Sequence, residues 1–142
     1  MRSKPITIQE VEYGAHALAR ALMKYSEPIP EFGTRYKGKL ESCLDTPFQT
    51  YGGKYLYKGL IGKVSILFYL LVKNHAFVNG NKRIAVMTVF SFVNKNKRWL
   101  AMPKKLLYEI AKEVAMSEAS DKDKEVEKIQ KIFNIYLVKA KR

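Results

Sequence analysis

The sequence predicts an all-α domain that carries one short β-hairpin. Apolar residues recur at helical spacing in several segments, and a Gly-Gly pair stands between two groups of aromatic residues. With 47% apolar and 27% charged residues, the composition is that of a folded globular protein. A chain of 142 residues also lies within the usual range of one domain. We therefore expect residues 1–142 to form a single domain.

The first predicted helix lies near the N-terminus. Its apolar residues recur every three or four positions, and the pattern stops before Pro28 and Pro30, which cannot continue a helix. These apolar residues are Ile8, Val11, Ala15, Leu18, Ala19 and Leu22. The segment from Gly33 to Lys39 is glycine-rich and polar and is typical of a loop. A short helix over residues 40–44 follows it and ends before Pro47.

The hairpin is predicted over residues 48–57, which read Phe-Gln-Thr-Tyr-Gly-Gly-Lys-Tyr-Leu-Tyr. Aromatic and β-branched residues favour strands, and the Gly52-Gly53 pair suits a tight turn between them.

Two central helices are predicted directly after the hairpin, from about Lys58 to Lys73 and from about Gly80 to Asn96. Their many apolar residues indicate that both helices are largely buried. A further helix follows Pro103. The last helix is opened by Asp121 and closed by lysines, and charges of these signs suit the helix dipole.

The chain is strongly basic, with 26 basic and 13 acidic residues and a net charge of +13. Such a surface favours acidic partners, which include nucleic acids, nucleotides and acidic proteins. The alternative is that lysine-rich runs such as residues 95–98 and 139–142 are solvated helix ends.

Cysteine content and hydropathy indicate the compartment. Cys43 is the sole cysteine, which excludes an internal disulfide and a metal site with several thiolates. Such a low cysteine content is typical of the reducing cytoplasm, and we interpret Cys43 as a small apolar residue. The first residues lack the apolar run of a signal peptide. The most apolar stretch, residues 59–72, contains Lys63 and is shorter than the roughly 20 residues that a membrane-spanning helix needs. We expect a cytoplasmic protein without a membrane segment.

A candidate anion site lies between the two central helices. The second of them begins with Gly80, Asn81, Lys82 and Arg83, whose first-turn N–H groups have no partner within the helix. An anion would satisfy these groups, and it would also balance two cations that the helix dipole disfavours. Gly80 would let it approach the backbone closely. Alternatively, Asn79 is an ordinary N-cap and the two cations point into solvent.

His75 is a candidate general base because it precedes this turn closely and imidazole suits proton transfer near neutral pH. The alternative is a capping or hydrogen-bonded core histidine. Phe77 is predicted to pin the loop to the core.

Residues 75–83 read His-Ala-Phe-Val-Asn-Gly-Asn-Lys-Arg, which resembles the Fic/Doc signature His-x-Phe-x-(Asp/Glu/Asn)-(Gly/Ala)-Asn-(Gly/Lys)-Arg. The segment over residues 40–57 also resembles the part of Doc (death-on-curing) proteins that precedes and forms their target-docking flap. The likeness covers roughly residues 8–100, and residues 101–142, which hold the last two helices, match only in character.

The resemblance implies a Fic-fold helical bundle with a β-hairpin flap before its two central helices. It implies that His75 deprotonates a hydroxyl of a target protein and that Lys82 and Arg83 act on the transferred phosphate. Asn79, Gly80, Asn81, Lys82 and Arg83 would bind ATP with Mg²⁺. Many relatives have a metal-binding carboxylate where Asn79 stands, and a carboxamide binds a hard cation less strongly.

Two positions indicate the subtype. AMP-transferring Fic enzymes carry glycine at the position of Lys82 and a second arginine at that of Val86. Doc-type members carry the lysine and transfer the γ-phosphate. The resemblance therefore implies a toxin kinase that modifies a target such as translation elongation factor Tu and that an antitoxin restrains. The alternatives are an AMP transferase, a catalytically inactive relative kept for protein binding, and a non-catalytic nucleic-acid-binding helical domain.

The predicted flap consists of Thr50, Tyr51, Gly52, Gly53 and Lys54. It would align an extended target segment by strand addition. The alternative is an ordinary surface hairpin.

Overall fold

The computed structural model describes residues 2–140, so Lys141 and Arg142 of the basic C-terminal run lie outside the described part. Its helices are α1 (Ile8–Glu10), the π-helix η1 (Val11–His16), α2 (Ala17–Leu22), the 3-10 turn η2 (Phe32–Thr34), α3 (Lys39–Asp45), the 3-10 turn η3 (Thr46–Phe48), α4 (Gly59–Lys73), α5 (Asn81–Lys95), α6 (Lys104–Met116), the 3-10 turn η4 (Ala119–Asp121) and α7 (Lys122–Tyr136). The strands are β1 (Thr50–Tyr51), β2 (Lys54–Tyr55), β3 (Arg98–Leu100) and β4 (Leu137–Lys139). The predicted mainly helical fold is therefore confirmed.

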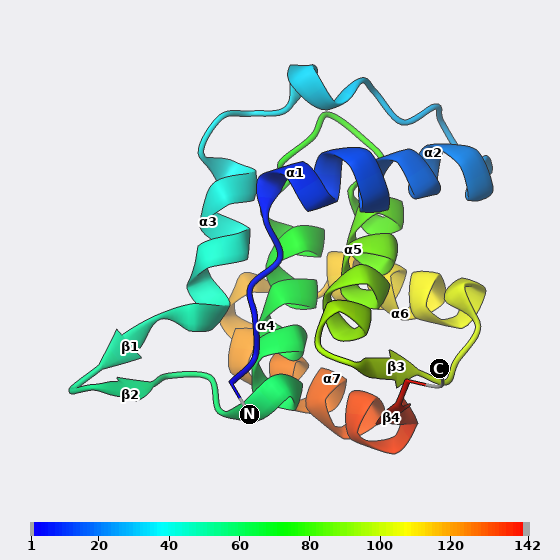
Figure 1. Cartoon of the computed structure of the whole chain (residues 1–142). Helices are drawn as coiled ribbons and strands as arrows, with labels where there is room; N and C mark the ends of the chain where they lie inside the picture. The colour runs from blue at the N-terminus through cyan, green and yellow to red at the C-terminus, as the bar shows by residue number, and fades with distance from the viewer. Residues whose placement is uncertain (1, 141–142) are drawn as a thin grey trace.

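Helices α4 and α5 form the centre of the molecule (Figure 1). They pack against each other, with α7 on α4 and α6 on α5, while the segment α1–η1–α2 crosses one end of the bundle. Both central helices are largely buried, as their apolar composition predicts. The largest side chains of the core include Phe68 of α4, Phe92 of α5 and Phe133 of α7. The two central helices and the loop that joins them thus form the most constrained part of the fold.

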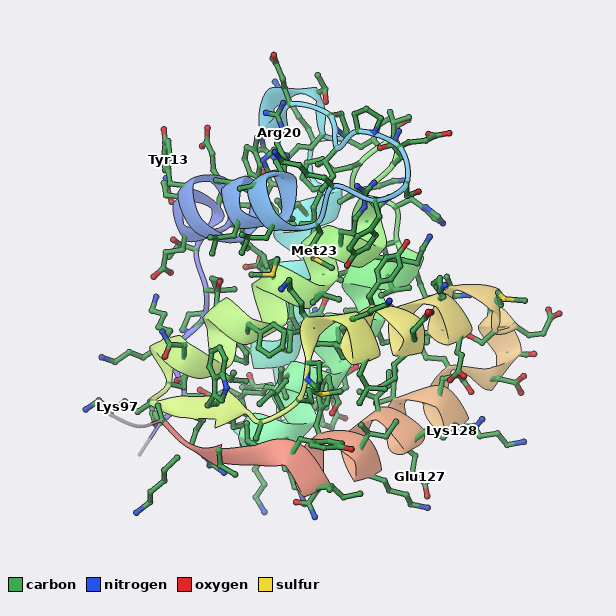
Figure 2. The ribbon with its side chains drawn as sticks, turned by 90° about the vertical axis from the view of Figure 1, so that its right-hand side faces the viewer. Tyr13, Arg20, Met23, Lys97, Glu127 and Lys128 are labelled. Carbon is green, nitrogen blue, oxygen red and sulfur yellow. The ribbon has the colours of Figure 1, made fainter. Side chains whose placement is uncertain are left out.

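The first helix was predicted, but its buried face differs from the prediction. Thr7 and Glu10 form a capping box at its start. Its middle is the π-helical segment η1, which has more residues per turn than an α-helix and shifts the later side chains around the axis. Leu18 and Leu22, the two leucines of the apolar pattern that predicted this helix, are therefore exposed, and His16 and Met23 are buried instead. Figure 2 shows Met23 between this helix and the central helices, while Tyr13 and Arg20 project outward.

The predicted hairpin is present, with Thr50 opposite Tyr55 and Tyr51 opposite Lys54. Gly52 and Gly53 form its turn, and both have positive φ values, a region that favours glycine. The hairpin extends away from the bundle beside α3 (Figure 1).

A second two-stranded sheet was not predicted. Strand β3 pairs antiparallel with β4, and Leu100 lies opposite Leu137. The last helix consequently ends at Tyr136, and Lys139 lies in a strand rather than in the helix end that the sequence indicated. Strands of three residues are too short to leave a recognisable period in the sequence.

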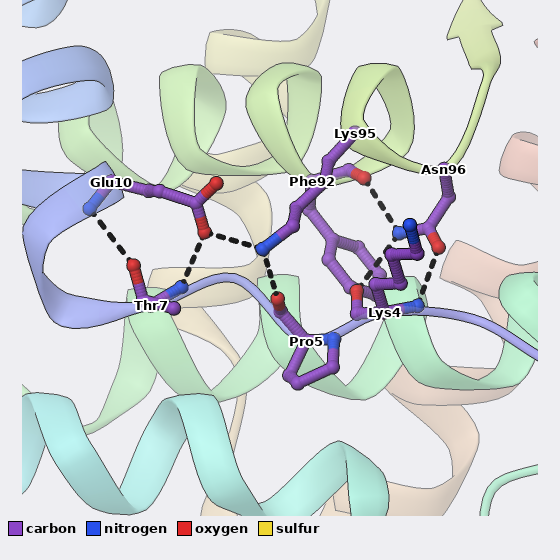
Figure 3. Close-up of polar contacts among 7 residues, drawn as sticks. All are labelled: Lys4, Pro5, Thr7, Glu10, Phe92, Lys95 and Asn96. Atoms are coloured by element: carbon purple, nitrogen blue, oxygen red, sulfur yellow. Dashed lines mark hydrogen bonds and ion pairs between the residues drawn. The ribbon is translucent and has the colours of Figure 1, made fainter.

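The N-terminal segment is fastened to the end of α5 (Figure 3). The Lys4 N–H donates to Asn96 Oδ1 at 2.6 Å, and Asn96 Nδ2 donates to the Lys4 carbonyl at 3.0 Å. Lys95 Nζ donates to the Pro5 carbonyl at 2.8 Å and pairs with Glu10 at 2.7 Å. The interpretation of residues 95–98 as a solvated helix end is therefore wrong for Lys95.

Cys43 and most of the highly apolar segment over residues 59–72 are buried. Cys43 is buried in the core, and burial raises the pKa of its thiol to about 11. Helix α4 lies in the core of the bundle. Within residues 2–140, no helix combines the length and the apolar character that crossing a membrane requires.

Candidate active site

The loop between α4 and α5 borders a cavity of about 270 Å³. The cavity gathers every residue of the predicted nucleotide site with His75, and it adds residues from the loop after α2, from α4 and from α6. Its lining consists of Ser26, Glu27, Val72, His75, Val78, Asn79, Gly80, Asn81, Lys82, Arg83, Tyr108 and Ala115. His75 and the predicted nucleotide-binding residues thus line one cavity.

His75 is held in an exposed position by a strained turn. Helix α4 ends at Lys73, and His75 takes the left-handed conformation with φ of +47°. This conformation is uncommon for residues other than glycine. The next residue is tied down, because the Tyr36 N–H donates to the Ala76 carbonyl at 2.9 Å. The imidazole is therefore accessible to a substrate while the backbone beside it is fixed.

Asn81 locks the loop to the first turn of α5. Its Oδ1 accepts from the Phe77 N–H at 3.0 Å, and its Nδ2 donates to the Phe77 carbonyl at 2.8 Å. Both polar atoms of the side chain are thus engaged by the backbone. In this geometry Asn81, predicted to bind the nucleotide, shapes the loop.

Phe77 anchors the same loop in the core, as predicted. Its side chain is 1% exposed and stacks on His16 with a centroid separation of 5.5 Å. Phe32 packs against both rings. His16 Nε2 lies 2.9 Å from the Pro30 carbonyl, to which it donates because a carbonyl oxygen only accepts. Burial lowers the pKa of this histidine. The sequence analysis missed His16, which becomes buried only through the π-helical segment.

Gly80 is required by its own packing. It is the N-cap of α5 with φ of +81°, so the alternative that Asn79 is the N-cap is wrong. A Cβ at residue 80 would lie 2.8 Å from Ile29 Cγ1. Ile29 therefore fills the side of Gly80 that a side chain would occupy, and this contact accounts for the glycine.

The two cations of the first turn of α5 have different environments. Arg83 is buried and donates to the carbonyls of Met23 and Glu27, so it caps the end of α2 while it borders the cavity. Lys82 is half-buried at the cavity, and within residues 2–140 its amine has no hydrogen-bond or ion-pair partner. No side chain of these residues caps the N-terminus of α5. Lys82 and the free amides can therefore hold an anion.

Glu27 joins the site from 52 positions away in the sequence. Its Oε2 accepts from Asn79 Nδ2 at 3.1 Å, whereas Asn79 Oδ1 is buried without a hydrogen-bond partner in residues 2–140. The sequence analysis missed Glu27 because nothing in the local pattern relates it to the signature.

The residues present fit a magnesium ion that is shared with a nucleotide. Within residues 2–140, no group of three or more His, Cys, Asp or Glu side chains could hold a metal alone. Mg²⁺ is usually bound by one or two carboxylates together with phosphate oxygens of the substrate. The Glu27 carboxylate has oxygens of the required kind, and Asn79 would add one if its amide turned Oδ1 rather than Nδ2 toward Glu27.

The predicted flap residues do not line this cavity. Thr50, Tyr51 and Lys54 are exposed on the hairpin. The hairpin is joined to α4 by Lys63, whose Nζ donates to the Tyr57 carbonyl at 2.7 Å and lies 4.0 Å from the centre of the Tyr55 ring. Burial lowers the pKa of this lysine. The hairpin is thus fixed at its base and exposed at its turn.

A larger cavity of about 570 Å³ lies between α6 and α7. Four acidic side chains and one lysine supply its charged lining: Glu113, Glu118, Asp121, Glu125 and Lys128. Such a lining repels phosphate, so the smaller cavity at His75 is the candidate site.

Comparison with known proteins identifies the family of the chain. Searches of curated proteins and of solved structures returned no match. The model of the Fic/DOC family matches residues 9–93, a stretch that extends from the first helix through most of α5 and includes His75 and all residues up to Arg83. Members of this family are transferases that modify proteins, generally with ATP and Mg²⁺. Because the match covers more than half of the chain, this protein belongs to the Fic/DOC family.

Proposed function

We propose that this protein is a Doc-like kinase that transfers the γ-phosphate of ATP to a hydroxyl of a target protein. The observation that carries the proposal is the cation pattern of α5. Lys82 borders the cavity, and its amine has no partner among the residues that the structure describes, whereas Val86 is fully buried in the core. Doc-type members likewise carry a lysine at the position of Lys82 and lack a second arginine at the position of Val86. The outer phosphate would therefore be held near Lys82 and His75.

The polar residues around the anion site have separate parts in the proposed reaction. His75 removes the proton of the target hydroxyl, since it is exposed at the mouth of the site. Lys82 and the free amides of α5 hold the phosphates, and Arg83 supports this turn from behind. Oxygens of Asn79 and Glu27, together with the phosphates, would hold Mg²⁺, which would supply neutralisation of phosphate charge. Asn81 keeps the loop in the geometry that the reaction needs.

The target would dock on the hairpin formed by β1 and β2. An extended segment that adds to its free edge would bring a hydroxyl to the site through main-chain hydrogen bonds. Elongation factor Tu is the candidate target, and the reaction would take place in the cytoplasm. An antitoxin protein is the proposed restraint, and the charge of +13 suits an acidic one.

The test is label transfer from Mg²⁺-ATP to purified elongation factor Tu and to a bacterial extract. Parallel reactions carry the label in the γ-phosphate or in the α-phosphate, and each is run with the wild type and with His75→Ala. We expect γ-label on a discrete protein with the wild type only. Transfer of α-label would instead identify an AMP transferase. Absence of both labels, with salt-dependent binding of nucleic acid that His75→Ala leaves unchanged, would favour a non-catalytic binding domain.

A further inference from the structure

The side chain of residue 79 is a carboxamide at the position where a carboxylate would bind a metal most strongly. An acidic side chain nevertheless reaches this position from another part of the chain. The Glu27 carboxylate contacts the Asn79 amide, with Oε2 and Nδ2 separated by 3.1 Å, and both residues border the cavity that holds His75. The fold therefore restores a negative charge beside residue 79.

We propose that Glu27 supplies the missing carboxylate and binds, with Asn79 Oδ1, the divalent cation that accompanies the nucleotide. This inference rests on the proposed nucleotide site, but it does not depend on which phosphate is transferred.

The state of the Asn79 amide supports this assignment. Its Nδ2 faces Glu27, and its Oδ1 is buried without a partner in residues 2–140. A buried acceptor without a partner is unfavourable, so a group that engages this oxygen would stabilise the site. A cation between the two side chains would attract both oxygens, and rotation of the amide about its terminal bond would turn Oδ1 toward it. The pair would then present two oxygens, the donor type that Mg²⁺ prefers.

The backbone around Glu27 is fixed in position by two features. Ser26, the residue before it, takes the left-handed conformation with φ of +69°. The buried Arg83 guanidinium donates to the Glu27 carbonyl, which fastens this turn to α5. The Glu27 side chain itself is exposed at the cavity. Arg83 therefore acts as a positioning residue that fixes the distance between Glu27 and Asn79.

A blocking role for Glu27 is the competing explanation. A carboxylate beside the phosphate site repels a nucleotide that carries no metal, and removal of that carboxylate would then tighten nucleotide binding. The two roles have opposite effects on binding of the metal-loaded nucleotide, so a binding measurement separates them without any transfer reaction.

The experiment measures binding of a non-hydrolysable ATP analogue, with Mn²⁺ as the probe ion and water-proton relaxation as the readout. Binding of the analogue without metal is measured by calorimetry. The variants are Glu27→Gln, the matched control Glu31→Gln, which removes an exposed carboxylate of the same loop, and the double variant Glu27→Gln/Asn79→Asp. Thermal unfolding of each variant checks the fold, which Glu27→Gln should keep because Arg83 contacts only the backbone of residue 27.

We expect Glu27→Gln to weaken binding of the Mn²⁺-loaded analogue by roughly tenfold or more, with no loss of metal-free binding. Glu31→Gln should bind as the wild type does, and Asn79→Asp in the double variant should restore binding by returning a carboxylate to residue 79. Unchanged or tighter binding of the loaded analogue by Glu27→Gln would overturn the inference. The label experiment above tests the kinase proposal separately, since transfer of α-label or of neither label would leave the metal result standing.

Discussion

The side-chain amide of Asn81 forms a pair of hydrogen bonds with the backbone of Phe77. Oδ1 accepts from the Phe77 N–H at 3.0 Å and Nδ2 donates to its carbonyl at 2.8 Å. The loop that carries His75 is thereby joined to the first turn of α5, whose amides are free to bind an anion. This pair of bonds couples the proposed base to the proposed phosphate site, and the first prediction follows from it.

Asn81→Ala should destabilise the protein by roughly 2–4 kcal/mol, because two buried backbone groups of Phe77 would lose their partners. Urea unfolding followed by circular dichroism measures this change. Asn94→Ala, in the exposed last turn of the same helix, is the matched control and should stay within about 0.5 kcal/mol of the wild type. Equal effects of the two substitutions would contradict the proposed role of the Asn81 amide.

Gly80→Ala should cost roughly 1–3 kcal/mol, because residue 80 has φ of +81° and a Cβ there would meet Ile29 Cγ1 at 2.8 Å. The control is Gly33→Ala, where no heavy atom lies within 4 Å of the added Cβ and φ is not positive. That substitution should be neutral or slightly stabilising. Chemical unfolding of both variants gives the comparison. A stable Gly80→Ala protein would show that Ile29 can move aside.

The stability of the protein should fall as the pH decreases below about 6.5, through protonation of His16. Burial lowers the pKa of His16 in the folded protein below its usual 6.5. The unfolded chain therefore takes up this proton first as the pH falls, and unfolding is favoured between the two pKa values. One proton changes the unfolding free energy by at most about 1.4 kcal/mol per pH unit.

The measurement is the unfolding free energy between pH 7.5 and pH 5 for the wild type, His16→Gln and His75→Ala. The sequence contains two histidines, so each variant isolates the other one. We expect His75→Ala to keep the decrease and His16→Gln to flatten it. A decrease that survives in His16→Gln would assign it to other groups.

Thr50→Pro should impair target modification without unfolding the protein. The Leu56 N–H donates to the Gln49 carbonyl at 3.1 Å, and Thr50 lies opposite Tyr55. Because hydrogen-bonded and non-hydrogen-bonded pairs alternate in an antiparallel ladder, the backbone groups of Thr50 point outward to a free edge. Gln49 has an extended conformation with ψ of 144°, which a following proline permits.

Loss of one main-chain hydrogen bond to the target should lower kcat/KM for protein modification roughly fivefold in Thr50→Pro. Thr50→Val, which keeps the N–H, is the control, and the melting temperatures of both variants should match that of the wild type. If both variants modify the target equally well, the target does not add to the β1 edge.

Local sequence patterns were enough to predict the helices and to indicate the family. Helical spacing of apolar residues located the first helix, α4, α5, α6 and α7, and Gly52-Gly53 located the hairpin turn, because these features depend on local periodicity and local backbone preference. The order of residues 75–83 also indicated the family that the comparison with the family model confirmed.

Features that depend on contacts between distant segments could be seen only in the tertiary structure. The π-helical segment moved His16 and Met23 into the core and turned Leu18 outward, which a period of 3.6 residues could not predict. The three-residue strands β3 and β4 form because Leu100 and Leu137 meet across 37 positions of chain. Glu27 contacts Asn79 across 52 positions of chain, and Arg83 of α5 holds the loop of Glu27 in place by donating to its carbonyl. The sequence therefore indicates which residue types belong to the site. Which of them lie in contact depends on the packing of segments that are far apart in the chain.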